Sequence, residues 1–146
     1  MTTFLDAAAL VALMRDEPGA ERVAAVLRSG PAAMTAINLG EAMDVVIRRG
    51  GLAPTDARRA IGRLTSSTLS VIPVDEALAW RAAELRARRY HRSRTPLSLS
   101  DCVCLAAAGE HDLVLTSDGP MLRVAQDEGI RSEALPDSSG ELPEGL

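Results

Sequence analysis

Four acidic residues stand at positions where an ionised side chain needs a partner, and they are Asp6, Glu41, Asp101 and Asp118. Asp6, for example, interrupts an apolar run that extends from Thr2 to Met14. Burying a carboxylate without a partner is costly. Successive members of the set are 35, 60 and 17 residues apart, so no local motif joins them and only the fold could bring them together.

A cluster of such carboxylates would have a definite chemistry. Neighbouring like charges raise the pKa values of carboxyl groups unless cations are bound. Oxygen ligands, with no histidine or thiolate among them, suit Mg²⁺ or Mn²⁺ rather than zinc. We therefore expect the four acids to hold a divalent cation.

The helical positions of two of these acids support this interpretation. Glu41 lies on the same predicted helical stripe as Ile37 and Val45, and this stripe is expected to face the core. Asp101 is flanked on one helical face by Leu105 and Ala108. A solvated acid belongs on the opposite face, so both positions indicate a function.

Helix capping is the ordinary alternative for two members of the set. Asp118 directly precedes a predicted helix and can serve as its N-cap. Asp101 can close a capping box with Ser98. Capping and metal binding are compatible, because a helix N-terminus also stabilises an ionised carboxylate. Glu41 is expected in mid-helix, where it would cap nothing.

Composition excludes some other chemistry. All 16 basic residues are arginine, and the absence of lysine disfavours a P-loop nucleotide site. Cys102 and Cys104 lie two residues apart in a predicted helix, so their side chains diverge and cannot form a disulfide. We expect both to be reduced and structural.

Strand and helix patterns alternate along the chain. The predicted strands are 2–6, 32–35, 69–74, 112–117 and 130–135, and the predicted helices are 7–14, 19–29, 37–49, 54–66, 75–90, 98–111 and 120–129. This order predicts an α/β fold in which a small, mostly parallel central sheet of four to five strands is flanked by helices. In such sheets the ligand site lies beyond the carboxyl ends of the strands, where Asp6 and Asp118 are expected.

The length predicts one domain over residues 1–136. The last ten residues, DSSGELPEGL at 137–146, have the composition of a disordered tail. The apolar runs are shorter than a membrane span requires. No basic stretch precedes an apolar one at the N-terminus, so we expect a cytoplasmic protein that does not bind membranes.

Positive charge is concentrated between residues 81 and 94. This segment carries six arginines against one glutamate, hence +5, whereas the whole chain has a formal charge of −4 and the remainder therefore carries −9. Cationic contacts supply much of the affinity for nucleic acid, and aromatic rings stack on unpaired bases. The residues expected to bind RNA are Arg86, Arg89, Arg92, Tyr90 and His91. A solvated helix face is the alternative.

Four segments of the sequence resemble the PIN-domain ribonucleases, and among them the VapC-type toxins of VapBC toxin–antitoxin modules. These segments are FLDAAALVALMRDEPGAERV, AINLGEAMDVVIRRGG, PLSLSDCVCLAAA and LVLTSD. The resemblance implies a single PIN-like domain and places the family's acidic positions on Asp6, Glu41, Asp101 and Asp118. In that family these acids coordinate one or two divalent cations, Mg²⁺ or Mn²⁺, that support hydrolysis of RNA.

The resemblance also implies supporting residues and partners. Thr116 and Ser117 match small hydroxyl positions beside the last acid, and Asn38 lies one turn before Glu41; for these three, local backbone capping is the alternative. The implied partners are RNA and a VapB-type antitoxin, with a homodimer that forms a heterotetramer or larger assembly. The apolar residues between 11 and 27 are either part of the dimer interface or part of the core.

Two other function classes stay open at this point. One is a catalytically inactive PIN-like module that binds RNA or protein, although such a module is expected to have lost one or more of the acids. The other is an unrelated α/β protein whose carboxylates only cap helices. That alternative would have to explain Glu41.

Overall fold

The computed structural model describes residues 1–144, which form five parallel strands in one sheet. In chain order the strands are β1 Thr3–Leu5, β2 Ala32–Thr35, β3 Leu69–Ile72, β4 Leu113–Thr116 and β5 Ser132–Ala134. Their order across the sheet is β3-β2-β1-β4-β5. The predicted α/β class and the parallel sheet are confirmed.

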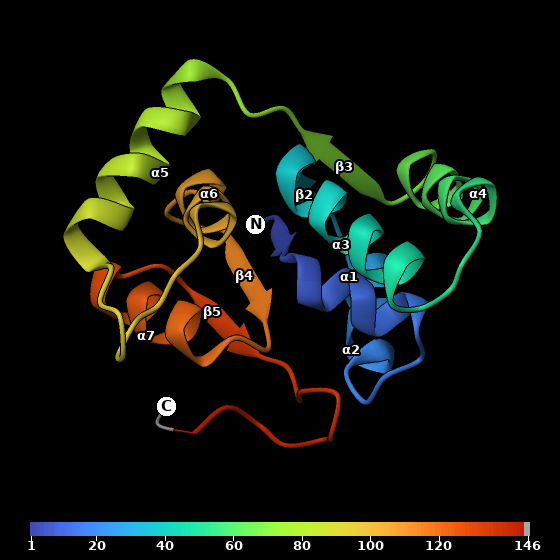
Figure 1. The fold of residues 1–146 in the computed structure, drawn as a ribbon. Coiled ribbons are helices and arrows are strands. Elements are labelled where there is room, and N and C mark those ends of the chain that lie inside the picture. The colour runs from blue at the N-terminus through green and yellow to red at the C-terminus, as the bar shows by residue number, and fades with distance from the viewer. Residues whose placement is uncertain (145–146) are drawn as a thin grey trace.

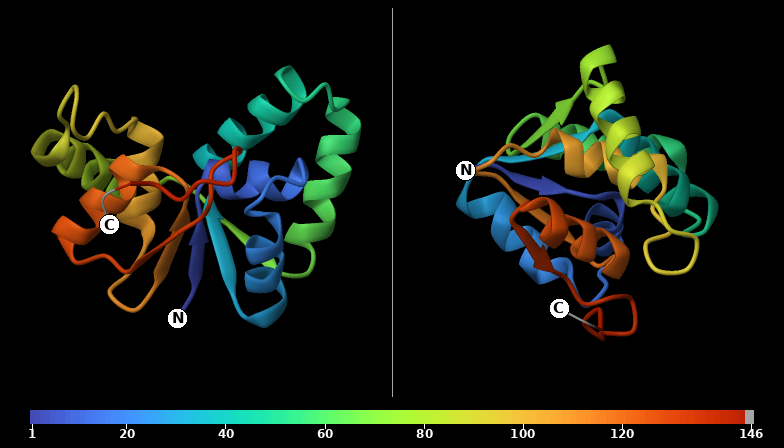
Figure 2. Two further views of the ribbon diagram at one scale, coloured as in Figure 1. Left: turned by 90° about the horizontal axis from the view of Figure 1, so that it is seen from below. Right: turned by 90° about the vertical axis from the view of Figure 1, so that its left-hand side faces the viewer.

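Helices cover both faces of this sheet (Figures 1 and 2). They are α1 Ala7–Met14, α2 Ala20–Ser29, α3 Ala36–Arg48, α4 Pro54–Thr65, α5 Glu76–Arg89, α6 Leu99–Ala107 and α7 Gly119–Glu128. Helices α1 to α4 lie on one side of the sheet, and α5 to α7 lie on the other (Figure 2). The three central strands β1, β2 and β4 are therefore buried on both faces, as parallel strands usually are, whereas the edge strands β3 and β5 are only partly buried.

Two hydrophobic cores follow from the alternation of side chains along the strands. Leu5 and Leu115 point into the core under α1 to α4, whereas their neighbours Phe4 and Val114 point into the core under α5 to α7. Val11, Val23, Val26 and Leu27 of α1 and α2 are buried in the first core, and Leu13 and Met14 pack against it while only partly buried. Most of the apolar side chains between residues 11 and 27 are thus part of the core.

Helix α6 is shorter than its sequence pattern predicts. The expected helix over 98–111 ends at Ala107, because Asp112 closes a turn on Gly109. The backbone N–H of Gly109 donates to Asp112 Oδ2 at 3.0 Å, and the N–H of Asp112 donates to the Gly109 carbonyl at 3.0 Å. Both cysteines of α6 are buried and unpaired, as expected.

The C-terminal segment contains neither helix nor strand between residues 137 and 144. Oδ1 of Asp137 accepts hydrogen bonds from the backbone N–H groups of Ser139 and Glu141, at 2.8 and 3.0 Å, and so closes a turn. The tail expected to be disordered, 137–146, ends in two residues that lie outside the described part of the chain. None of the helices described is long and apolar enough to span a membrane.

Candidate metal centre at the carboxyl edge of the sheet

Strands β1 and β4 bring Asp6 and Asp118 to the same edge of the sheet. Leu5 pairs with Leu115 across the two strands, so Asp6 follows β1 where Thr116 ends β4. The Thr116 hydroxyl donates a hydrogen bond to Asp6 Oδ2 and accepts one, at 3.0 Å, from the backbone N–H of Asp118. Thr116 is completely buried. Through these contacts Thr116 holds both the Asp6 carboxylate and the backbone of Asp118.

Three of the four acids lie at helix N-termini that open on this edge. Asp6 caps α1 by accepting from Ala9 N–H at 2.7 Å, and Asp118 caps α7 by accepting from Met121 N–H at 2.7 Å. Asp101 forms a capping box with Ser98: Ser98 N–H donates to Asp101 Oδ2 at 2.7 Å. The capping interpretation is therefore correct for Asp101 and Asp118.

In three of the acids, only one of the two carboxylate oxygens accepts a hydrogen bond within the described part of the chain. Among residues 1–144, Oδ1 of Asp101, Oδ2 of Asp118 and Oε1 of Glu41 accept no hydrogen bond. One oxygen of each group therefore fixes the side chain, and the other is available to a ligand.

Glu41 lies at this edge on helix α3, but it lies on the exposed face of the helix and not on the core-facing one that the sequence predicted. Glu41 is exposed and Ile37 is 47% exposed, so the expectation that their stripe faces the core is wrong. The buried face of α3 is formed by Asn38, Ala42 and Val46. Because this adjacent face also carries small or apolar residues at helical spacing, it packs on the sheet and turns Glu41 toward the carboxyl edge.

A direct contact holds Glu41 against α6. The Ser100 hydroxyl donates to Glu41 Oε2 at 2.9 Å, and Ser100 immediately precedes Asp101. Asn38, which is buried, donates from Nδ2 to the Ser100 carbonyl at 3.2 Å and accepts from the Thr35 hydroxyl. Asn38 therefore ties α3 to α6 without a hydrogen bond to Glu41. The sequence interpretation missed Thr35 and Ser100, which carry no motif.

Ser117 is half-buried and lines a hollow of about 400 Å³ that Glu41 also borders. Its hydroxyl makes no hydrogen bond within residues 1–144. Leu135 and the following residues to Ser138 also line this hollow. Ser117 is thus beside the acids, although no contact fixes its role.

Electrostatics couple the acids to one another. Burial raises the pKa of Asp6 to about 7, and the charges of Asp101 and Asp118 add to the rise, whereas the hydrogen bonds from Thr116 and Ala9 oppose it. The pKa of Asp118 is also raised, first by burial and then by Asp101. A cation at this edge would favour the ionised form of every acid.

The buried thiol of Cys104 lies within the electrostatic field of the same acids. Its pKa is raised well above the ordinary value, first by burial and then by the charges of Asp6, Asp101 and Glu41. The charges of three of the acids therefore all affect the pKa of this one buried thiol. They come from the end of β1, from α6 and from α3, far apart in the sequence.

The donor set suits a hard divalent cation, although the side chains as they lie do not form a closed coordination shell. Carboxylate oxygens are the ligands that Mg²⁺ and Mn²⁺ prefer, and three of the four acids keep an oxygen without a partner. Within residues 1–144, no three His, Cys, Asp or Glu side chains converge closely enough to hold an ion in their present positions.

The basic segment is less positive in the fold than in the sequence. Arg89 pairs with Glu128 at 2.5 Å and with Asp127 at 3.6 Å, and Arg88 pairs with Glu128 at 3.0 Å. Both acids come from α7. Arg86 donates to the Leu97 carbonyl at 3.0 Å. Counting charge only within residues 81–94 therefore overestimated what is available to a ligand.

The remaining residues expected to bind RNA lie at the end of α5 and in the loop after it. The Tyr90 ring is 4.4 Å from the Arg86 guanidinium, measured to the ring centroid. His91 Nδ1 accepts from the backbone N–H groups of Ser93 and Arg94, at 3.3 and 3.2 Å. Arg92 is exposed and makes no ion pair within residues 1–144. These contacts shape the loop and leave Arg92 accessible.

Comparison with known protein families gives a match over most of the chain. The family model of the PIN domain matches residues 3–127. A comparison with the curated proteins gives no match.

Several solved structures share the fold. DNA-bound VapBC from Salmonella typhimurium is 24% identical with a TM-score of 0.67, and the match covers 91% of this chain and 97% of the other. VapBC-1 from nontypeable Haemophilus influenzae is 20% identical with a TM-score of 0.63 and the same coverage. VapC20 from Mycobacterium tuberculosis, described as a toxin that cleaves the sarcin–ricin loop, is 21% identical with a TM-score of 0.57, over 88% and 84% of the chains.

Proposed function

The chain belongs to the PIN-domain family, and from that premise we propose that it is a metal-dependent endoribonuclease that hydrolyses RNA phosphodiester bonds. The observation that carries the proposal is the grouping of Asp6, Glu41, Asp101 and Asp118 at one edge of the sheet, with the pKa of Asp6 raised to about 7. The match to the PIN domain overturns the alternative of an unrelated protein whose acids only cap helices.

The four carboxylates would hold Mg²⁺ or Mn²⁺, which lowers the pKa of a bound water and stabilises a leaving oxygen. Thr116 keeps Asp6 directed toward the edge, and the α7 N-terminus does the same for Asp118. Ser100 holds Glu41 beside the α6 N-terminus. The protein's part in the reaction would thus be to hold four acidic side chains at one edge of the sheet, from which they close around an ion when it binds.

We further propose that the protein acts in the cytoplasm as the toxin of a type II toxin–antitoxin pair. The solved structures with the same fold include VapBC complexes from two species and a toxin that cleaves the sarcin–ricin loop. The partner would be a VapB-type antitoxin, whose arginine or lysine suits the acidic edge. Assembly would proceed through a homodimer to a heterotetramer or larger complex.

An inactive PIN-like module that binds RNA or protein is the second candidate. Loss of a metal-binding acid is the expected mark of such a protein. All four acids are present, and each has a contact that positions it. These contacts favour the enzyme.

Cleavage of a mixed tRNA and rRNA pool tests the proposal. The purified protein, free of antitoxin, is expected to give discrete fragments with Mg²⁺ or Mn²⁺ and none with EDTA. Glu41→Gln should abolish cleavage, whereas Asp44→Asn should not, because Asp44 lies one turn further along α3 and pairs with Arg48 at 2.6 Å. The two variants remove the same charge from the same helix.

Two results would contradict the enzyme. One is an absence of fragments with every metal and both RNA classes from protein shown to be folded by its melting temperature. The other is cleavage that survives Glu41→Gln, which would place the site elsewhere or indicate a contaminating nuclease.

A further inference from the structure

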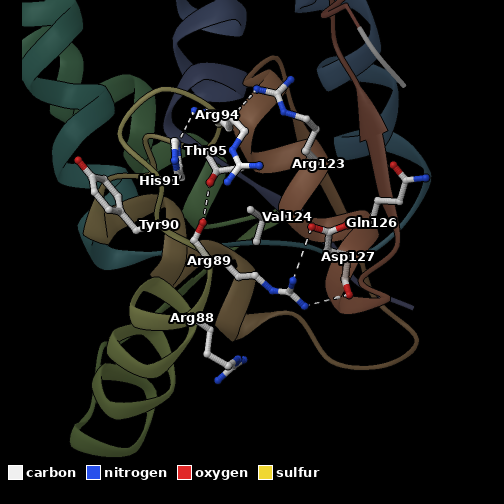
Figure 3. Close-up of a pocket in the computed structure, with 10 residues that line it drawn as sticks. All are labelled: Arg88, Arg89, Tyr90, His91, Arg94, Thr95, Arg123, Val124, Gln126 and Asp127. Carbon is white, nitrogen blue, oxygen red and sulfur yellow. Dashed lines mark hydrogen bonds and ion pairs between the residues drawn. The ribbon is translucent and has the colours of Figure 1, made fainter.

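A second hollow, of about 490 Å³, lies between the end of α5, the loop that follows it and helix α7 (Figure 3). Arginine dominates its lining, with Arg88, Arg89, Arg94 and Arg123 supplied by three different segments. Asp127 is the acid that lines it. The hollow is therefore a positively charged concavity that the fold assembles.

The four arginines differ in how far acids neutralise them. Arg88 and Arg89 are paired with acids of α7, and the Arg89 guanidinium turns toward Asp127 (Figure 3). Arg94 and Arg123 make no ion pair with any acid of residues 1–144. Arg123 Nη2 donates to the Arg94 carbonyl at 2.9 Å, which holds the loop against α7. Arg94 and Arg123 thus lie together, and no acid of residues 1–144 forms an ion pair with either of them.

Arg123 lies beside the N-terminus of α7, where Asp118 stands. Asp118 caps α7, and Arg123 Nη1 lies 3.4 Å from the point where a Cβ on Gly119, the first residue of that helix, would stand. A group bound at Arg123 would be beside the α7 N-terminus.

We propose that Arg94 and Arg123 bind a backbone phosphate of single-stranded RNA, next to the phosphodiester that would be hydrolysed at the acidic edge. The inference rests on the proposed function and deepens it by naming the residues that hold the substrate. Planar guanidinium groups match phosphate oxygens in charge and geometry. The Tyr90 ring points away from the Arg94 and Arg123 guanidinium groups (Figure 3).

Binding without cleavage tests this site. The affinity of a fluorescein-labelled single-stranded RNA is measured in EDTA over a range of KCl concentrations. For single strands, the slope of log affinity against log salt changes by about 0.7 for each phosphate that the protein neutralises. The double variant Arg94→Ala/Arg123→Ala should therefore have a slope shallower by about 0.7 or more, and it should bind different RNA sequences more weakly to the same extent.

Two further variants separate phosphate binding from a structural role. Arg63→Ala removes an exposed arginine of α4, at the opposite end of the molecule from α7 (Figure 1), and should leave the slope unchanged. Arg123→Lys keeps the charge and should retain most of the slope. A slope unchanged in the double variant, or lowered equally by Arg63→Ala, would overturn the assignment.

The result is independent of catalysis. Because binding is measured without metal, failure of the proposed enzyme would appear as absent cleavage by the wild-type protein. Failure of this site would appear as an unchanged salt slope. RNA affinity that is unaffected in the double variant while affinity for an acidic peptide falls would assign the hollow to a protein partner and contradict the RNA site.

Discussion

The buried hydroxyl of Thr116 donates a hydrogen bond to Asp6, 110 residues earlier in the chain. The same oxygen accepts from the backbone N–H of Asp118. One threonine at the end of β4 thus fixes the acid that follows β1 and the acid that begins α7. The carboxyl edge of the sheet is organised around this residue.

Replacing Thr116 with a side chain of similar shape should show what its hydroxyl hydrogen bonds contribute to stability and activity. Thr116→Val removes the donor to Asp6 and the acceptor for Asp118 N–H, which should lower the free energy of unfolding by about 1–3 kcal/mol. The pKa of Asp6 should rise further, because the hydroxyl lowers it. Urea unfolding and the pH dependence of RNA cleavage measure both effects.

Thr116→Ser is the matched control because it keeps the hydroxyl. It should retain cleavage and leave the pH dependence close to that of the wild type. Equal activities for the Ser and Val variants would mean that the hydroxyl does not orient Asp6.

The raised pKa of Asp6 predicts a specific dependence of stability on pH. Its pKa is about 7 in the folded protein against an ordinary value of 3.8, so the folded state holds this proton more tightly than the unfolded state. Deprotonation therefore weakens the metal-free fold progressively as pH rises from about 4 to 7. Above that range the loss is complete, on the order of 4 kcal/mol.

Asp6→Asn isolates this contribution, since asparagine can cap α1 as well as aspartate can. In EDTA, the wild type should lose stability relative to the variant between pH 5 and pH 8, as measured by urea unfolding at each pH. If the wild type instead became more stable relative to the variant between pH 5 and pH 8, the raised pKa of Asp6 would be contradicted. Mn²⁺ should stabilise the wild type at pH 8 but not the variant.

Local patterns predicted the strands and helices closely but not the contacts between distant segments. The strand AAMT and the helix AAALVALM have the predicted bounds, because alternation and helix-forming composition are local properties. The ion pairs of Arg88 and Arg89 join residues 38 to 40 positions apart. No pattern within α5 could reveal that its charge is neutralised by α7.

The sequence argument selected the four acids as candidate ligands, but its reason for selecting Glu41 was wrong. Asp6 and Asp118 follow from the rule that sites lie beyond the carboxyl ends of parallel strands. Glu41 was selected as a core-facing acid, but α3 has two adjacent stripes of small or apolar residues and buries the one that contains Asn38. A helical pattern that is apolar over a wide arc does not determine which part of the arc is buried.

Asn38 should affect both stability and activity, because it connects α3 to α6. Asn38→Ala removes its hydrogen bond to the Ser100 carbonyl and leaves the Thr35 hydroxyl without its partner. Unfolding free energy should fall by about 1–3 kcal/mol, and cleavage should slow because Glu41 is less well placed. Ser100→Ala removes the hydroxyl that holds Glu41, so it should slow cleavage with a smaller change in stability.

Parallel measurements of kcat and of urea unfolding distinguish the two variants. If Asn38→Ala lowers stability while the folded fraction cleaves RNA at the wild-type rate, Asn38 is a structural residue alone. If Ser100→Ala has no effect on kcat, its hydroxyl does not position Glu41.

Calorimetric titration with Mn²⁺ is the most direct test that these acids form a metal centre. Asp118→Asn and Asp75→Asn make the same change at two helix N-caps, since Asp75 caps α5 by accepting from Leu78 N–H at 2.8 Å. Asparagine preserves both caps. We predict that Asp118→Asn weakens Mn²⁺ binding about tenfold or more and that Asp75→Asn leaves it unchanged; equal Mn²⁺ affinity in the wild type and both variants would contradict a metal centre at Asp118.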